Sequence, residues 1–501
     1  MKARALAILG TGSDVGKSLI TAGICRLLRR TGVSVAPFKA QNMSLNSFVT
    51  PHGHEIGRAQ ALQAEACGIP PHVDMNPILL KPESDTCSQV VLLGKVLGKR
   101  EASTYFDGRQ GLWSVVEESY ARLAGQYEMI VIEGAGSAAE VNLREQDLVN
   151  WPVVKLADAH VVLVADIDRG GIFAQVLGTL DLLAPDERAR VRGVVINKFR
   201  GDATLFADGV TFLEARSGLP VLGVVPFLHD LRLDQEDSLD LDRNRQRSFA
   251  SDRINIAVIL LPHMSNFTDF NILASEADVA LKYVDSSSSL TEADVVIIPG
   301  SKNTLADLCY LRGNGYGFAL DNHLRSGREL IGICGGYQML GRQISDPYKV
   351  EQGGTSRGLS YLNTETKLEQ AKRTTQVIAR TENGFVRDQI LVRGYQIHMG
   401  ITRRETELPC FRVHRQSVLG EKDEEEFDGA IRKDGLVWGT YIHGVFDEPG
   451  FRRAWLNRAR TRKGLPLLEE LVSKMVTVRS QNELDRWADH VSHHLDLSCL
   501  I

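Results

Sequence analysis

The stretch ALAILGTGSDVGKSLITAGICRLL (Ala5–Leu28) joins a short apolar strand, a glycine-bearing loop and the start of a helix. Lys17 and Ser18 open the expected helix. In loops of this kind, backbone N–H groups surround phosphate oxygens, the lysine reaches the β- and γ-phosphates, and the serine hydroxyl can bind Mg²⁺. The stretch therefore predicts a βα unit that binds ATP.

The spacing of the loop departs from the strict form GxxxxGK[ST]. That form would place glycine at position 11, where this chain has Thr11 between Gly10 and Gly12. The loop is therefore a variant of the phosphate-binding loop. Its predicted ATP-binding residues are Gly12, Gly16, Lys17 and Ser18.

Short runs rich in β-branched residues alternate with helix-length segments along the first half of the chain. This alternation is typical of βαβ units and predicts a doubly wound, mainly parallel sheet in residues 1–230. The runs are Ala5–Leu9, Val33–Phe38, Met129–Ile132, His160–Ala165, Val191–Ile196 and Val221–Val225.

The pattern stops at residues 231–253, which are polar and charged and which we interpret as a linker. A second alternation begins at Ile254–Leu261 and continues to Leu436–Tyr441, so residues 254–501 are expected to form a second, open α/β domain. The C-terminal segment, with Trp455 and Trp487 among polar residues, predicts helices packed on that domain.

Composition limits the classes of function. The chain has 501 residues with 58 Lys+Arg against 63 Asp+Glu, a formal net charge of -5. This balance argues against a nucleic-acid or lipid-surface partner, and no apolar run approaches the ~18 residues of a membrane span. The 7 cysteines are spread singly, which favours a reducing cytoplasm over a disulfide or zinc framework. A cytoplasmic location is therefore expected.

Acidic side chains at strand ends are the candidate Mg²⁺ ligands, because ligands of parallel sheets bind at the carboxyl ends of strands. Glu133 follows the apolar run Met129–Ile132, and Glu55 is a second candidate. Asp166 and Asp168 also end a strand and fit a site or a helix cap equally well. Lys39 closes the second strand and could meet a phosphate or a substrate carboxylate.

Cys334 lies in ELIGICGGYQML between an apolar run and a helical run. The surrounding glycines allow the sharp strand-to-helix turn that exposes a nucleophile, and the N–H of Gly335 becomes an oxyanion donor. The Pro-Gly turn of VVIIPGSKNT could supply the second donor at Gly300. Because a free thiol needs a base, we expect His443 in TYIHGVFD to serve Cys334, while His398 orients the substrate or the loop.

These motifs carry a family resemblance. The loop resembles that of dethiobiotin synthetase and its relatives, and GICGGYQMLG, PGSKNT, GYQIHMG and TYIHGVFD resemble the flavodoxin-like class I glutamine amidotransferase domain. Together with PFKAQNMSLNS, IEGAGSAAEVNL, INKFRGD and SNFTDFN, the chain resembles the cobyric acid synthase family over nearly its full length. It departs from the usual HxE of amidotransferases, because Val445 stands where glutamate is expected, so the third triad member is left open.

The resemblance implies a glutamine-hydrolysing ligase. Cys334 and His443 would release ammonia from glutamine, and ATP with Mg²⁺ would activate carboxylates of a corrinoid, adenosylcobyrinic acid a,c-diamide, for amidation at positions b, d, e and g. Asn197 would contact adenine, and Asp147 and Arg169 would handle the substrate, although the cap or surface interpretation of these last two is equally good.

Two alternatives remain open at this point. Cobyrinic acid a,c-diamide synthase shares both domains, and the stretch PFKAQNMSLNS weighs against it. A partition-type switch ATPase shares the phosphate-binding loop, and the cysteine turn weighs against that. The oligomeric state cannot be read from the sequence.

Overall fold

The computed structural model describes residues 3–83, 86–101, 109–229, 231–233, 248–382, 384–386, 389–414 and 425–498. The chain forms two compact units. Unit 1 contains Met1–Ser44, His54–Asp237 and Gln481–Ile501, and unit 2 contains Leu45–Gly53 and Ser238–Ser480. The expected linker spans the change of unit, and its residues 234–247 lie outside the described residues, as does Cys499.

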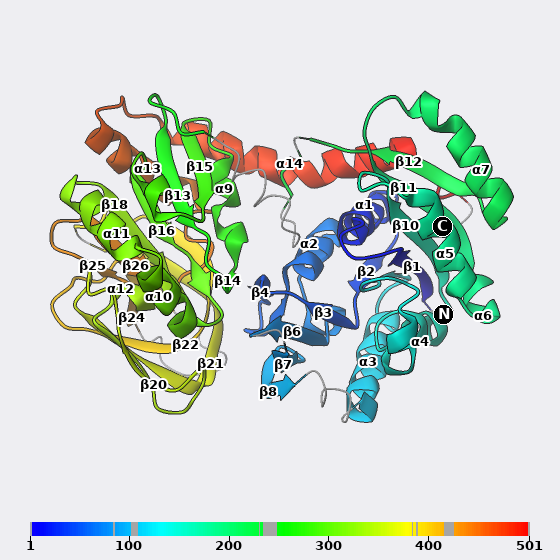
Figure 1. The fold of residues 1–501 in the computed structure, drawn as a ribbon, viewed down its shortest axis with the longest axis horizontal. Coiled ribbons are helices and arrows are strands. Elements are labelled where there is room, and N and C mark those ends of the chain that lie inside the picture. Colours follow the sequence, from blue (N-terminus) through cyan, green and yellow to red (C-terminus); the bar gives the residue numbers. More distant parts are fainter. Residues whose placement is uncertain are drawn as a thin grey trace. The chain divides into compact units, whose positions relative to one another are not determined.

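Unit 1 is built on a sheet of order β12-β11-β10-β1-β9-β2 in which every pair is parallel (Figure 1). Its strands are rich in β-branched residues and are covered on both faces, as parallel sheets require. The predicted parallel sheet is confirmed. The strands are β1 Arg4–Gly10, β2 Val35–Phe38, β9 Met129–Glu133, β10 His160–Asp166, β11 Val191–Phe199 and β12 Val221–Pro226.

Helices and a small second sheet complete unit 1. The helices are α1 Lys17–Arg30, α2 Arg58–Cys67, α3 Arg109–Ala124, α4 Trp151–Ala157, α5 Ile172–Leu182, α6 Pro185–Arg188 and α7 Ala207–Ser217, with 3-10 turns η1 Val73–Met75, η3 Val141–Gln146 and η4 Ala203–Phe206. The second sheet has the order β3-β6-β7-β8, from Gln41–Met43, Ile78–Pro82, Cys87–Leu92 and Lys95–Glu101. Strand β5 is Glu55–Gly57.

Unit 2 contains a sheet of order β15-β13-β16-β18-β26-β25, parallel except for its last pair. The first five strands follow the flavodoxin-like order, which confirms the open α/β expectation. They are β13 Ile254–Ile259, β15 Val279–Val284, β16 Val295–Ile298, β18 Glu329–Ile333 and β26 Val437–Thr440, and β25 is Ala430–Ile431. The helices are α9 Asn271–Ala274, α10 Thr304–Gly313, α11 Tyr316–Arg325, α12 Gly335–Leu340 and α13 Pro449–Lys463, with turns η5 Phe267–Phe270 and η6 Ser287–Leu290.

A second, mostly antiparallel sheet in unit 2 was not part of the expectation. Its order is β20-β19-β21-β23-β24, and β22 also pairs with β21. The strands are β19 Gln343–Asp346, β20 Gly354–Arg357, β21 Thr364–Thr381, β22 Leu391–Arg404, β23 Phe411–His414 and β24 Glu425–Asp428. Short strands β14 Met264–Ser265 and β17 Gly300–Ser301 pair beside the parallel sheet, and β4 is Ser47–Val49.

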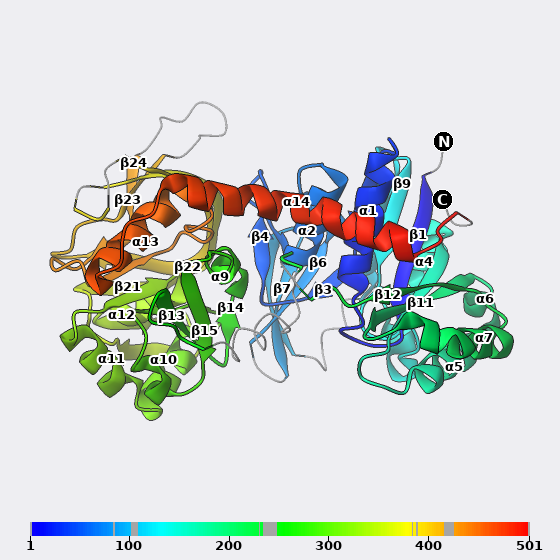
Figure 2. The ribbon, with the colours of Figure 1, turned by 90° about the horizontal axis from the view of Figure 1, so that it is seen from above.

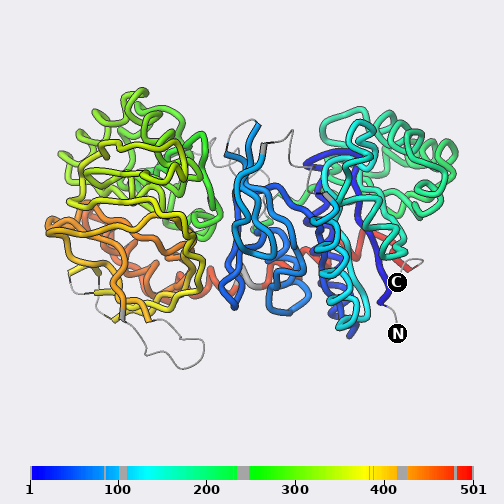
Figure 3. The backbone as a smooth tube through the Cα atoms, turned by 90° about the horizontal axis from the view of Figure 1, so that it is seen from below, coloured from blue at the N-terminus to red at the C-terminus, as the bar shows by residue number. Residues whose placement is uncertain are grey.

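The C-terminal helix α14 (Glu470–His494) corrects one expectation, because its residues from Gln481 onward belong to unit 1. Figure 2 shows this end of α14 beside α1. Figure 3 shows the backbone from the opposite side, with the C-terminal segment in red. Leu484, Trp487 and Val491 join the apolar core under α1. Asp485 forms an ion pair with Arg26 at 2.7 Å. Among the described residues, no helix has both the length and the apolar character needed to cross a membrane.

Candidate active sites

The phosphate-binding loop lies between β1 and α1 in unit 1. Gly16 caps α1 with a φ of 94°, and a Cβ at this position would lie 2.2 Å from the side-chain nitrogen of Asn197, so glycine is required there. The Nζ of Lys17 donates to the carbonyl oxygens of Gly12 at 2.8 Å and Gly136 at 2.9 Å. These hydrogen bonds hold the lysine side chain across the loop. A phosphate oxygen could take the place of one carbonyl oxygen as the acceptor of a hydrogen bond from Nζ.

Glu133, at the end of β9, is the centre of a buried polar cluster next to this loop. Its carboxylate accepts hydrogen bonds from the Ser18 hydroxyl at 2.7 Å, the Lys39 ammonium at 2.8 Å and the Gln63 amide at 2.5 Å. Burial alone would raise the pKa of Glu133, but the Lys39 charge and these hydrogen bonds outweigh it and lower the pKa. Glu133 is therefore an ionised carboxylate inside the unit.

The donor set fits a Mg²⁺ ion. Ser18 and Glu133 present neighbouring hard oxygens, and Mg²⁺ usually takes only one or two protein carboxylates and fills its remaining positions with water and phosphate. Glu55 is placed differently, because its buried carboxylate forms an ion pair with Lys81 at 2.7 Å. A metal role for Glu55 stays a prediction and would require that ion pair to open.

The other residues predicted for unit 1 lie around the loop. Asn197 donates to the carbonyl oxygen of Val15 at 2.8 Å and so supports the loop, while its expected contact with adenine stays a prediction. Arg169 is exposed and pairs with Asp14 of the loop at 3.2 Å. Asp147 accepts from the N–H groups of Val149, Asn150 and Trp151 at 2.8 to 3.0 Å, and so holds the turn that leads into α4, whose N-cap is Asn150.

The acidic pair at the end of β10 has structural partners. Asp166 forms an ion pair with Lys198 at 3.1 Å, and Lys198 also donates to the carbonyl oxygen of Asp14 in the loop. Asp168 pairs with Arg200 at 2.6 Å. Asp166 is therefore linked through Lys198 to the loop, and neither carboxylate caps α5, whose N-cap is Gly171.

In unit 2, Cys334 lies on the sharp turn between β18 and α12. Its φ of 51° and ψ of -106° are a strained conformation for a residue with a side chain. A Cβ at Gly336 would lie 2.0 Å from the carbonyl oxygen of Ile298, and a Cβ at Gly332 would lie 2.6 Å from the backbone of Gly336. The glycines are therefore required for this turn, which is the geometry of a nucleophile elbow.

His443 follows β26 and is fully buried beside Cys334. Its Nδ1 lies 2.7 Å from a carboxylate oxygen of Asp269, whose other oxygen accepts from the N–H of Gly444 at 3.1 Å. Asp269 on η5 therefore has the position of a third triad member, where the sequence has Val445 in place of the usual glutamate. No role for Asp269 was predicted from the sequence. The signal that could have indicated one is its place in the family motif SNFTDFN.

Electrostatics favour a charged His443. Burial lowers the pKa of the imidazole, but Asp269 and the neighbouring Cys334 more than compensate and raise it to about 10. A protonated imidazole beside a thiol stabilises the thiolate, which is the nucleophilic form of cysteine. The arrangement can therefore attack a carboxamide at neutral pH.

Gly300 and Gly335, the predicted oxyanion donors, both lie at this centre. A Cβ at Gly300 would come within 3.4 Å of the ring of His443, and a Cβ at Gly335 would come within 2.9 Å of the N–H nitrogen of Ser301. Gly335 is also the first residue of α12, directly after Cys334. Their role as oxyanion donors stays a prediction, supported by this placement.

His398 is separated from the triad by its own contacts. Its Nδ1 lies 2.7 Å from the carbonyl oxygen of Gly400, and its ring stacks on Tyr441 with centroids 3.8 Å apart. Burial lowers the pKa of His398 to about 3, so this imidazole is neutral. An imidazole with so low a pKa is a weak base, so His398 fits an orienting role better.

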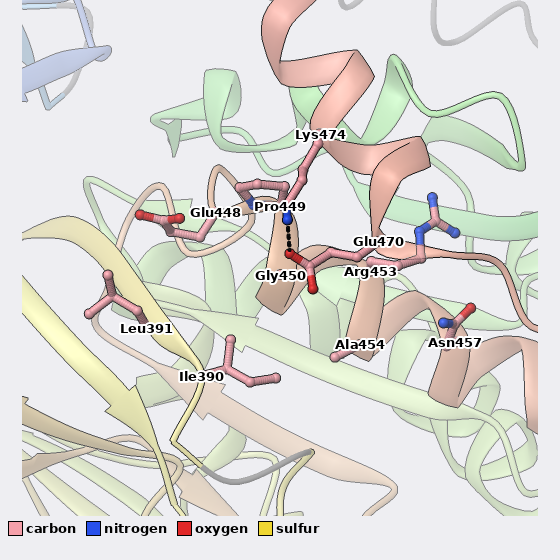
Figure 4. A pocket seen from close by; sticks show the side chains of 10 residues that line it. All are labelled: Ile390, Leu391, Glu448, Pro449, Gly450, Arg453, Ala454, Asn457, Glu470 and Lys474. Carbon is pink, nitrogen blue, oxygen red and sulfur yellow. Dashed lines mark ion pairs between the residues drawn. The ribbon is translucent and has the colours of Figure 1, made fainter.

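Each unit contains a cavity among its described residues. In unit 1, a cavity of about 210 Å³ is lined by Gln41, Gly136, Asp147 and Trp151, among others. In unit 2, a cavity of about 520 Å³ has a lining that includes neither Cys334 nor His443. Figure 4 shows that Glu470 and Lys474 in its wall face each other, and they form an ion pair at 2.9 Å. Of these two cavities, the one in unit 1 lies beside a predicted centre, since Gly136 in its lining accepts from Lys17.

Comparison with known proteins agrees with both domains. The CobQ/CobB/MinD/ParA nucleotide binding domain matches residues 6–240, and the CobB/CobQ-like glutamine amidotransferase domain matches residues 255–451. A cobyric acid synthase of Syntrophobacter fumaroxidans is 48% identical over 99% of this chain and 98% of its own length. One of Klebsiella pneumoniae is 49% identical over 98% of this chain and 96% of its own. Since these similarities extend over nearly the full length and include both domains, the chain belongs to the cobyric acid synthase family, glutamine amidotransferases of cobalamin biosynthesis.

Proposed function

We propose that this chain uses ATP and glutamine to amidate the b, d, e and g carboxylates of adenosylcobyrinic acid a,c-diamide, giving adenosylcobyric acid. The observation that carries the proposal is the presence of two complete centres on one chain. One is the Lys17–Ser18–Glu133 cluster for carboxylate activation, and the other is the Cys334–His443–Asp269 triad for ammonia release.

Ammonia release begins at Cys334. Its thiolate attacks the carboxamide carbon of glutamine, and the N–H groups of Gly300 and Gly335 stabilise the oxygen as it becomes negative. His443 gives its proton to the departing ammonia, which leaves a thioester on Cys334. His443 then takes a proton from water as the water attacks the thioester, so glutamate leaves and the thiolate returns.

Carboxylate activation occurs in unit 1. A carboxylate oxygen of the corrinoid attacks the γ-phosphorus of ATP, ADP leaves, and ammonia then displaces phosphate from the acyl phosphate to form the amide. Lys17 would hold the β- and γ-phosphates, and Ser18 and Glu133 would hold Mg²⁺, which would neutralise charge on the phosphates. Lys39, on the other side of Glu133, would hold the incoming carboxylate.

The cavity of about 210 Å³ in unit 1 supports Asp147 as a substrate residue. Its volume is below the ~300 Å³ at which pockets begin to enclose a drug-sized ligand. It could admit one side chain of a corrinoid, while the ring would stay outside. Such a site allows successive carboxylates of one substrate to enter in turn. Arg169, on the exposed surface near the loop, could guide these carboxylates. The substrate roles of Asp147 and Arg169 are part of the proposal.

The number of new amides separates this proposal from its near alternative. The chain is incubated with ATP, the corrinoid and glutamine that carries heavy nitrogen in its amide, and the product is analysed by mass spectrometry. Heavy nitrogen at all of the b, d, e and g positions is expected. Failure to amidate the a,c-diamide, together with amidation of cobyrinic acid at a and c alone, would contradict the proposal. ATP hydrolysis that needs neither glutamine nor corrinoid would instead indicate a switch ATPase.

Lys17→Ala tests the division of labour between the centres. Because Lys17 supplies a positive charge to the transferred phosphate, amidation should fall by roughly 10²- to 10³-fold with either glutamine or free ammonia. Hydrolysis of glutamine alone should be unchanged, because the triad lies in unit 2. Both rates are measured in the same preparation. A variant that loses glutamine-dependent amidation but keeps ammonia-dependent amidation would contradict the assignment of Lys17.

A further inference from the structure

The stretch Leu45–Gly53 has a position that its sequence does not predict. It lies inside residues 6–240, which match the nucleotide-binding domain, yet its contacts place it in unit 2. We call it the strap. The chain enters it from Ser44 and leaves it at His54, and both of these residues belong to unit 1. The strap is therefore a piece of the ATP-binding part of the sequence that folds with the glutaminase centre.

Two hydrogen bonds join the strap to the turn that carries Asp269, and each runs from a backbone N–H to an asparagine side chain. The side-chain oxygen of Asn46 accepts from the N–H of Phe267 at 3.1 Å, and the N–H of Ser47 donates to the side-chain oxygen of Asn266 at 3.0 Å. Asn46 and Ser47 are buried, with 2% and 1% of their surface exposed. Since Phe267 is the first residue of η5, Asn46 fixes the start of the turn on which Asp269 lies.

A second set of contacts reaches His443 directly. The hydroxyl of Tyr395 donates to the carbonyl oxygen of Ser47 at 3.3 Å, and its ring stacks on that of His443 with centroids 5.3 Å apart. Tyr395 and His443 also exchange backbone hydrogen bonds at 3.1 and 2.8 Å. Asn266, which the strap holds, places its amide nitrogen 3.4 Å from the Nε2 of His443.

Apolar packing anchors the strap against the same elements. Val49 is fully buried and forms a small core with Tyr395 and Ile397. The sulfur of Cys334 lies 3.4 Å from the carbonyl oxygen of Ile397. The contacts of Asn46, Ser47 and Val49 therefore include residues that touch His443 or Cys334 or that precede Asp269.

We infer that the strap, through Asn46 and Ser47, positions the base of the glutaminase triad. A histidine acts well only when it is held within a fraction of an ångström of the reacting atoms, and a displacement of ~1 Å can cost on the order of 10² in rate. Both ends of the strap continue along the chain into residues of unit 1. The inference rests on glutamine hydrolysis at Cys334 and not on which carboxylates are amidated.

Asn46→Ala in the full chain tests this inference. The variant loses the acceptor for Phe267, so we expect kcat for glutamine hydrolysis to fall about 10- to 100-fold with little change in KM. The pH profile of kcat should shift, because the distance between Asp269 and His443 sets the pKa of His443. Asn46→Asp keeps an acceptor oxygen and should recover most of the rate. Pro51→Ala, an exposed position of the same strap, is the matched control.

Ammonia-dependent amidation and the melting temperature are measured for every variant. The first should not change if unit 1 is intact, and the second shows that the variant is folded at the assay temperature, although the lost buried hydrogen bond should lower it. A normal glutaminase rate and pH profile in Asn46→Ala would overturn the inference. So would an equal loss of glutaminase and ammonia-dependent activity, which would indicate a general structural role. Absence of glutamine hydrolysis in the unmodified chain is a different result, since it would contradict the proposed function itself.

Discussion

Cys334→Ser should abolish glutamine-dependent amidation and leave ammonia-dependent amidation close to normal. The expected loss of glutamine hydrolysis is on the order of 10⁶, as for removal of other triad nucleophiles. The reason lies in the nucleophile. A serine hydroxyl is a much weaker acid than a thiol, so the replacement removes the thiolate chemistry on which attack at the amide depends.

The measurement compares amide formation with glutamine and with ammonium chloride as nitrogen source, using one preparation of each variant. Cys309→Ser is the matched control, because Cys309 is an exposed free thiol on α10 of the same unit. It should use both nitrogen sources normally. If a folded Cys334→Ser variant also failed with ammonia, then the centres would not be separable and the assignment of Cys334 as glutaminase nucleophile alone would be wrong.

The sequence predicted well those features whose partners are close together along the chain. Lys17, Ser18 and the glycines of the loop stand in one short motif, and Cys334 stands among the glycines that its turn requires. Glu133 could be predicted because strand ends of a parallel sheet meet at one edge. In each case a local sequence pattern restricts the backbone conformation, and that conformation positions the functional side chain.

The sequence could not predict contacts between distant segments. Asp269 is 174 residues from His443, and an aspartate in a short turn has no distinctive pattern. The long pair of β21 and β22 carries polar residues on both faces over much of its length, so it lacks the buried run of the parallel strands. The end of α14 looks like any amphipathic helix, and only Trp487 and its neighbours show that it packs under α1.

Asp269→Asn should reduce glutamine hydrolysis by about 10³- to 10⁴-fold while ammonia-dependent amidation continues. In triads of this kind, the aspartate orients the imidazole and stabilises its charged form, and the neutral amide removes that charge without changing the shape. The pKa of His443 should therefore fall from about 10. Because the active pair needs a protonated His443, the alkaline limb of the pH profile should move to lower pH.

The decisive readout is kcat/KM for glutamine as a function of pH, with ammonia-dependent amidation measured in parallel. Asp321→Asn serves as the matched control, because Asp321 lies on α11 at the surface, where it accepts from the hydroxyl of Tyr361 at 2.8 Å. It should retain the original profile. A normal rate with an unshifted alkaline limb in Asp269→Asn would show that Cys334 and His443 act without a third member. Since Asp269 directly bonds both the ring of His443 and the backbone of Gly444, a large loss is the result that this geometry requires.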